Sequence, residues 1–204
     1  MSDDIQMRKA PLQARSREKL EKILGAATEL ILERGLIALG VREVTRRAGV
    51  NVATFYQFFP NKTALISELS ERHRARVQLL LENMLMDDDI ATLEEAVTVV
   101  FNRIREFYLA NPDYMELWFA DQSEPVLREA FVEDARQNSR AVVKLMQKWM
   151  PDADYPMIET VALHLVITSS QIMRWMAYTD KEESQRLLSL HIQWTLSFLK
   201  QSDA

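Results

Sequence analysis

Side chains that could bind a polyanion are concentrated between residues 41 and 62. Arginine pairs with phosphate oxygens, while hydroxyl and carboxamide groups bond to phosphates or to the edges of DNA bases. Three arginines, Arg42, Arg46 and Arg47, precede a run of short polar and aromatic residues. In that run we expect five residues to face DNA: Asn51, Ala53, Thr54, Tyr56 and Gln57. For Arg46 and Arg47 a solvated helix face is an equally good explanation.

Two short helices are needed to hold these side chains. Helical patterns cover about 41–48 and 52–58 and meet at Ala48-Gly49-Val50-Asn51. Gly49 can take the positive φ that ends a helix, and Asn51 can cap the next one. This layout predicts a helix-turn-helix, whose second helix lies in the DNA major groove. The residues expected to face inward are Val41, Val44, Ala48, Val52, and Phe55 or Phe59.

Residue types that carry catalysis are absent or badly spaced. The chain has no cysteine, so thiol nucleophiles, disulfides and zinc-thiolate sites are excluded. The three histidines are scattered without metal-ligand spacing, and Ser169-Ser170 lacks the flanking pattern of a nucleophile elbow. The run 87–89 of three aspartates lacks the alternate spacing of a calcium loop. We expect no enzyme activity, no cofactor and no metal site.

Composition and charge favour an all-α protein with a basic head. Four glycines and six prolines in 204 residues leave little material for the turns of a β fold. Net charge is −5, but residues 1–76 hold 14 Lys/Arg and 9 Asp/Glu, a net of +5. The remaining 128 residues are therefore acidic. This split indicates that only the first third meets a polyanion.

The rest of the sequence predicts further helices. Apolar periodicity predicts a first helix at about 16–34 and a fourth at about 62–85. Later helices are expected at about 92–109, 112–120, 124–149, 156–178 and 183–200. The prediction is about nine helices: a three-helix head joined to a larger body. The expected domains are 1–61, with a basic arm that includes Arg8, Lys9 and Arg15, and 62–204. Whether the arm contacts DNA stays open.

The body is rich in methionine and aromatic residues that could line a pocket for an apolar or aromatic ligand. The same side chains also make ordinary cores, and that alternative stays open for each of them. His164 and Gln171 lie within an apolar helix and could form hydrogen bonds with a ligand in such a pocket. The pocket candidates are Phe107, Tyr108, Tyr114, Trp118, Met146, Trp149, His164, Gln171 and Trp175. The last two helices are broadly apolar, which suits a helical interface between subunits.

Residues 16–70 resemble the TetR family of bacterial transcriptional regulators. The likeness is carried by Ala48-Gly49-Val50, by the end of the first helix at Glu33-Arg34-Gly35, and by the residues Asn51, Thr54, Tyr56, Phe59, Lys62 and Leu65. The resemblance implies a homodimer paired through the last two helices, with each third helix on one half of a pseudo-palindromic DNA operator. It also implies repression that a small molecule in the body relieves.

The resemblance and the side-chain chemistry together suggest roles for the head residues. Tyr56 and Lys62 match family positions that hold phosphates, while Thr54 and Gln57 are the expected base readers. Arg42 and Arg46 are expected on backbone or base edges. Departures from the family pattern stand at Leu39-Gly40, Val44-Thr45, Ala53, Phe55 and Phe58, and Thr45 should fit if its hydroxyl bonds back to the helix.

The expected function is therefore that of a ligand-responsive, DNA-binding transcriptional repressor. Two alternatives stay open: an architectural DNA binder without an effector, and an all-α carrier or enzyme on the same scaffold. No stretch is long and apolar enough for a membrane span, and the acidic start is not a secretory signal, so a cytoplasmic location is expected. The sequence does not identify the operator, the effector or the regulated genes, nor decide between repression and activation.

Overall fold

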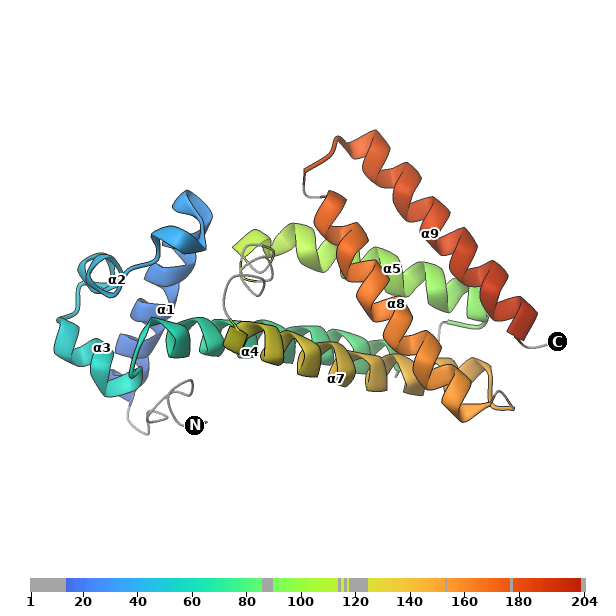
Figure 1. The fold of residues 1–204 in the computed structure, drawn as a ribbon, viewed down its shortest axis with the longest axis horizontal. Coiled ribbons are helices and arrows are strands. Elements are labelled where there is room, and N and C mark those ends of the chain that lie inside the picture. Colours follow the sequence, from blue (N-terminus) through green and yellow to red (C-terminus); the bar gives the residue numbers. More distant parts are fainter. Residues whose placement is uncertain are drawn as a thin grey trace. The chain divides into compact units, whose positions relative to one another are not determined.

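The protein is described by a computed structural model, which covers residues 14–85, 90–113, 115, 117, 125–152, 154–176 and 178–202. Within these ranges the chain forms eight α-helices, one short 3-10 helix and no strand (Figure 1). The all-α prediction is confirmed, and the expected count of about nine helices is close. No helix in the described ranges is long and apolar enough to cross a membrane.

The first four helical elements are α1 (Ala14–Arg34), η2 (Leu36–Ala38), α2 (Val41–Ala48) and α3 (Val52–Phe58). Helix α1 ends at Arg34, and the following Gly35 has a φ of 72°, which is strained for any residue with a Cβ. Its amide donates to the Ile31 carbonyl at 2.8 Å and closes the last turn. The ranges expected for α2 and α3 coincide with those observed.

One buried apolar cluster holds these helices together. The inner stripe of α1, which includes Ile23 and Leu30, packs with Val44 of α2 and Phe55 of α3. Residues from the start of α4 (Lys62–Leu85), such as Leu65, complete the cluster. Asn61 starts α4 by accepting a hydrogen bond from the Ala64 amide at 2.9 Å. Apolar residues of α1 and of the start of α4 thus support α2 and α3.

The chain divides into two compact units. The first contains the described residues of Met1–Arg74 and Asn111–Phe131, and the second those of Ala75–Ala110 and Val132–Ala204. The expected boundary between residues 61 and 62 falls inside the first unit. Leu117, which is 4% exposed, belongs to the same apolar cluster as α1 and α3. The first unit therefore includes a segment that the sequence pattern assigned to the body.

The remaining helices are α5 (Leu93–Ala110), α7 (Pro125–Trp149), α8 (Tyr155–Met176) and α9 (Lys181–Ser202). Polar side chains cap the first turns of α5, α8 and α9. The Thr92 hydroxyl accepts from the Glu95 amide at 3.2 Å, and the Asp180 carboxylate accepts from the Glu183 amide at 2.8 Å. Helices α8 and α9 run antiparallel beside α5 (Figure 1).

The described residues of the second unit form two buried apolar clusters. One contains Met146 of α7 and Met150, which follows that helix, with Ile158 and Ala162 of α8. The other joins Phe101 of α5 to Met173 of α8 and Leu188 of α9. Methionine fills irregular gaps because it is unbranched and flexible. These clusters show that several Met residues of the body serve as core.

Candidate functional site

The turn between α2 and α3 sets the angle between these two helices. Gly49 lies in the left-handed region with φ 64° and ψ 32°, as the sequence predicted. Its amide donates to the Arg46 carbonyl at 3.3 Å, and the Val50 amide donates to the Thr45 carbonyl at 3.0 Å. These bonds satisfy carbonyls at the end of α2. The Thr45 hydroxyl bonds back to the Arg42 carbonyl at 3.1 Å, as expected for a buried Thr in a helix.

The predicted cap of α3 is confirmed, and it gives Thr54 a different role from the one expected. The Asn51 carboxamide oxygen accepts from the Thr54 amide at 2.7 Å and from the Thr54 hydroxyl at 2.8 Å. The Thr54 side chain is 7% exposed. Its hydroxyl donates to the Asn51 carboxamide oxygen that caps the helix. Thr54 is therefore a buried residue that supports the cap of α3.

Val52 is also placed differently from the expectation. The sequence predicted that it would face inward, but it is 40% exposed. The buried residues of α3 are Thr54, Phe55 and Phe58. The helix is thus rotated relative to the predicted orientation. Its exposed face carries Val52, Ala53, Tyr56 and Gln57, with Asn51 just before them.

The two residues expected to contact phosphates, Tyr56 and Lys62, lie on α3 and at the start of α4. Tyr56 is 44% exposed, and its ring meets that of Phe55 edge to face at a centroid distance of 5.5 Å. The buried Phe55 thereby supports the exposed phenol. Lys62 is partly buried in the first turn of α4. The face can offer a phenol, a carboxamide and two small apolar side chains to a partner.

The three arginines of α2 have distinct surroundings. Arg42 is exposed. Arg46 makes a two-pronged ion pair with Glu43 in its own helix, with Nε to Oε2 at 3.0 Å and a second nitrogen to Oε1 at 2.5 Å. Arg47 makes a two-pronged pair with Glu33 of α1 at 2.6 and 2.7 Å. The sequence left open whether Arg47 lies on a solvated helix face. In the structure its guanidinium joins α2 to α1.

These pairs shift the acidity of the carboxyl groups. The Arg46 guanidinium beside Glu43 lowers the pKa of that carboxyl, and Arg47 does the same for the pKa of Glu33. Both carboxylates therefore stay ionised well below neutral pH. The surface around α2 carries fixed charges of both signs.

A buried pair in the first unit joins α4 to residues beyond α5. His73 Nε2 and Asp113 Oδ2 are 2.8 Å apart, with side chains 5% and 13% exposed. A buried polar group needs such a partner because desolvation without one is costly. Together with Leu117, this pair fixes the returning segment to the head.

The nine predicted pocket residues have different surroundings. Tyr114 and Trp118 lie outside the described residues. Tyr108 packs against the cluster around Phe101, and burial raises the pKa of its phenol. Met146 is buried, with 5% exposure, and Phe107 and Trp149 are partly buried. Trp175 lies at the surface, with 58% exposure. His164 and Gln171 line a groove.

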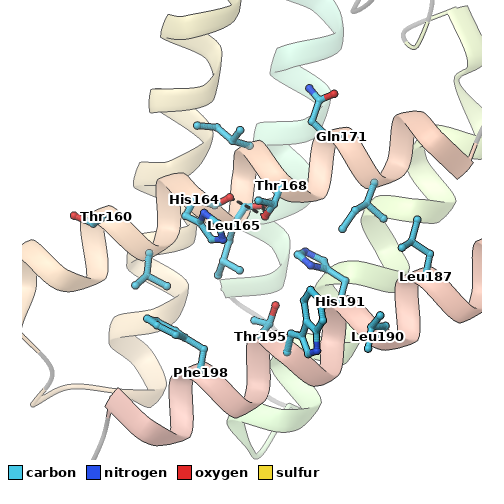
Figure 2. Close-up of a pocket in the computed structure, with 14 residues that line it drawn as sticks. Thr160, His164, Leu165, Thr168, Gln171, Leu187, Leu190, His191, Thr195 and Phe198 are labelled. Carbon is cyan, nitrogen blue, oxygen red and sulfur yellow. Dashed lines mark hydrogen bonds between the residues drawn. The ribbon is translucent and has the colours of Figure 1, made fainter.

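That groove lies between α8 and α9 and has a volume of about 850 Å³. Figure 2 shows side chains of both helices lining it, with His164 and Leu165 from α8 and His191 and Thr195 from α9. Its rim is apolar and exposed. Trp194 is 68% exposed, Phe198 50% and Leu190 42%. The sequence indicated an apolar face here but not that it would remain open within one chain.

His191 forms the polar centre of the groove floor. Its Nε2 lies 3.2 Å from the Ser169 hydroxyl oxygen, and its ring meets Phe101 edge to face at 4.8 Å. Burial lowers the pKa of His191, and the nearby His164 lowers it further. The sequence gave no signal for this contact, because Ser169 and His191 are 22 residues apart on different helices.

Comparison with known proteins gives local similarity to bacterial regulators. A segment of 53 residues, 26% of this chain, is 43% identical to the uncharacterized HTH-type transcriptional regulator YvdT of Bacillus subtilis and covers 27% of it. A second B. subtilis regulator of this type, YdgC, is 24% identical over 53% of this chain and 56% of its own length. The chain thus spans about a quarter to a half of the length of these relatives.

The fold matches solved structures over nearly the whole chain. A transcriptional regulator from Rhodococcus sp. RHA1 superimposes with a TM-score of 0.71, 17% identity and coverage of 90% of this chain and 97% of that one. A TetR-family regulator described as putative, from Mesorhizobium loti, gives a TM-score of 0.67 and 18% identity over 91% and 98% of the two chains. At such identities the likeness concerns the fold.

Two family models match adjoining parts of the sequence. The model of bacterial regulatory proteins of the tetR family matches residues 23–69, which hold the helix-turn-helix and its supporting helices. The model of the tetracyclin repressor-like C-terminal domain matches residues 91–190. Both the head and the body are thus assigned by sequence, in the order that the fold displays, and the chain belongs to the TetR family of bacterial regulatory proteins.

Proposed function

We propose that this protein is a homodimeric transcriptional repressor that binds a pseudo-palindromic DNA operator through α3 and releases it when a small apolar or aromatic molecule binds the body. The observation that carries the proposal is the capped helix-turn-helix, which displays Val52, Ala53, Tyr56 and Gln57 on one exposed face. A short helix with such a face fits the major groove. The regulators to which the chain is similar support the same role.

On the DNA side, each exposed group has a role suited to its chemistry. The carboxamide of Gln57 can bond to a base edge, and the small apolar side chains of Val52 and Ala53 can contact thymine methyl groups. Tyr56, Lys62 and Arg42 donate to phosphate oxygens, which positions the helix without reading sequence. Thr54 is left out of this set because its hydroxyl bonds Asn51.

The second copy of the chain is assigned to the groove between α8 and α9. A monomer with Trp194, Phe198 and Leu190 this exposed leaves a contiguous apolar surface in water, which favours association. Two antiparallel helices from each subunit make a four-helix interface with two-fold symmetry. His164 and Gln171, expected in an effector pocket, then lie at the subunit interface.

For the effector, support comes from the partly buried aromatic residues of the second unit. Phe107 and Tyr108 meet edge to face at 5.8 Å, and Trp149 is partly buried on α7. Adaptable apolar surroundings of this kind accept apolar or aromatic molecules. A thermal-shift screen of apolar compounds, followed by DNA-binding assays of the hits, tests this part. Hits limited to sugars or metal ions would contradict it.

The DNA-binding proposal is tested by selecting bound sequences from random and genomic DNA. We expect enrichment of a pseudo-palindrome whose half-sites lie about one helical turn, roughly 34 Å, apart. In anisotropy titrations Gln57→Ala should alter base preference at defined positions, at a cost of about 1–3 kcal/mol for a lost base contact. Tyr56→Phe should weaken binding to all sequences alike. Recovery of no preferred sequence would overturn the proposal.

A further inference from the structure

The exposed face of α2 carries an ion pair, Glu43 with Arg46, that the proposed function does not use. Arg42 and Arg46 are four residues apart and lie on one face of the helix. The Arg46 guanidinium does not point freely into solvent. Its Nε donates to Glu43 Oε2 at 3.0 Å and a terminal nitrogen donates to Oε1 at 2.5 Å. A nitrogen of Arg34 lies 3.9 Å from the same Oε1.

The Glu43–Arg46 pair does not join two helices, as the pair of Arg47 with Glu33 does. Arg47 has a side chain only 20% exposed and bridges α2 to Glu33 of α1. Arg46 is 68% exposed, and its partner is three residues away in the same helix. Exposed pairs at this spacing contribute little to stability, since solvent screens them and both side chains lose freedom. The main consequence of the Glu43–Arg46 pair is therefore for charged partners.

We propose that Glu43 is a positioning residue that holds Arg46 away from DNA phosphates and thereby lowers the affinity of the head for all DNA sequences. The inference rests on the proposed DNA-binding function. A phosphate oxygen can take the two nitrogens that face Glu43, Nε and one terminal nitrogen, only by displacing the carboxylate. Because phosphate contacts carry no sequence information, the effect is the same for the operator and for unrelated DNA.

The size of the effect follows from the strength of exposed ion pairs. Releasing Arg46 should tighten binding roughly two- to fivefold for each head on DNA. An additional phosphate contact should steepen the slope of log affinity against log salt by up to about 0.9 for each head. A change in the salt slope separates this mechanism from a purely structural role of Glu43, which would leave the slope unchanged.

The test uses the full-length protein and two labelled duplexes of equal length: the sequence selected with the wild type, and a scrambled version of it. Anisotropy titrations over a series of KCl concentrations compare the wild type with three variants. Glu43→Gln releases Arg46. Glu18→Gln is the matched control, because it removes one carboxylate from an exposed pair with Lys22 at 2.8 Å in the same unit. The double variant Glu43→Gln with Arg46→Gln removes both partners.

We expect Glu43→Gln to tighten binding to both duplexes by one common factor and to steepen the salt slope. Glu18→Gln should change both quantities less, and the double variant should bind no better than wild type. Unchanged or weaker binding by Glu43→Gln, an equal gain from Glu18→Gln, or a gain that persists without Arg46 would each overturn the inference.

Folding and the underlying function are checked separately. Circular dichroism and the unfolding midpoint show whether Glu43→Gln retains its helices. If it does not, Glu43→Asp, which keeps the charge on a shorter side chain, should still tighten binding to a smaller degree, and no change would count against the inference. If the wild type binds the selected and scrambled duplexes equally, the sequence-specific function fails, while the common gain from Glu43→Gln can still appear.

Discussion

The Asn51 carboxamide oxygen accepts two hydrogen bonds from Thr54, one from the backbone amide at 2.7 Å and one from the side-chain hydroxyl at 2.8 Å. This pairing starts α3 and fixes which of its side chains face outward. An amide at the first turn of a helix has no partner within the helix, so the cap satisfies a donor that would otherwise need water. The orientation of the DNA-facing residues depends on this contact.

Removing the cap should destabilise the first unit. We expect Asn51→Ala to lower the free energy of unfolding by about 0.5–2 kcal/mol, because two hydrogen bonds to Thr54 are lost. Asn51→Asp retains an acceptor at the same place and should be much closer to wild type. Urea unfolding followed by circular dichroism measures both. Equal stability of Asn51→Ala and wild type would show that the cap is not needed.

Val52 and Thr54 should differ in their effects on DNA recognition, contrary to the sequence-based expectation. Val52→Ala should change base preference by up to about 0.8 kcal/mol for each methyl group that leaves a contact with DNA. Thr54→Val should leave base preference unchanged while lowering stability by about 0.5–1.5 kcal/mol through loss of its hydrogen bond. Binding titrations against single-base variants of the selected operator make the comparison. A larger preference change for Thr54→Val would reverse the assignment.

Charge introduced in the groove between α8 and α9 should prevent dimer formation. Leu190 lines the groove and is 42% exposed, so Leu190→Glu should place a carboxylate in the subunit interface and yield monomers. Leu109 on α5 is 61% exposed and does not line the groove, so Leu109→Glu is the matched control and should stay dimeric. Light scattering after size-exclusion chromatography gives the molar mass. Dimers of Leu190→Glu would place the interface elsewhere.

The buried imidazole of His191 should make stability depend on pH. Because its pKa is lower in the folded protein than in the unfolded chain, the unfolded chain binds more protons as pH falls. The contribution of His191 is therefore fully present above pH 6.5 or so and is lost as pH falls from there through its lowered folded pKa. The His191→Gln variant should lose less stability than wild type between neutral and mildly acidic pH. Parallel curves from urea unfolding would contradict this.

The local structure of the head could be predicted from its sequence because short-range signals determine it. Gly49 allows a positive φ, Asn51 supplies a cap, and Pro60 cannot continue α3, so the bounds of α2 and α3 follow from a few residues. The orientation of α3 was predicted less well. Seven residues make about two turns, too few for apolar periodicity to fix the buried face. The cap at Asn51 and the packing of Phe55 and Phe58 in the buried cluster leave Thr54 buried and Val52 exposed.

The proposed pocket was harder to predict for a different reason. An aromatic residue near a helix end gives the same sequence signal whether it lines a cavity or fills a core. Tyr108 packs against a buried cluster, whereas Trp175 on α8 is exposed and its indole donates to Glu183 at 3.2 Å. The contact of Ser169 with His191 depends on the pairing of two helices, which a single sequence does not reveal.

The return of residues 111–131 to the first unit makes the head topologically inseparable from the body. The backbone leaves the first unit after Arg74, re-enters it at Asn111 and leaves it again after Phe131. A fragment ending at residue 61 or 74 would lack Leu117 from its apolar core, and would lack Asp113, the partner of His73. Genetic exchange of heads between relatives by a single splice would therefore cut through one core, and a working chimera would have to carry both segments.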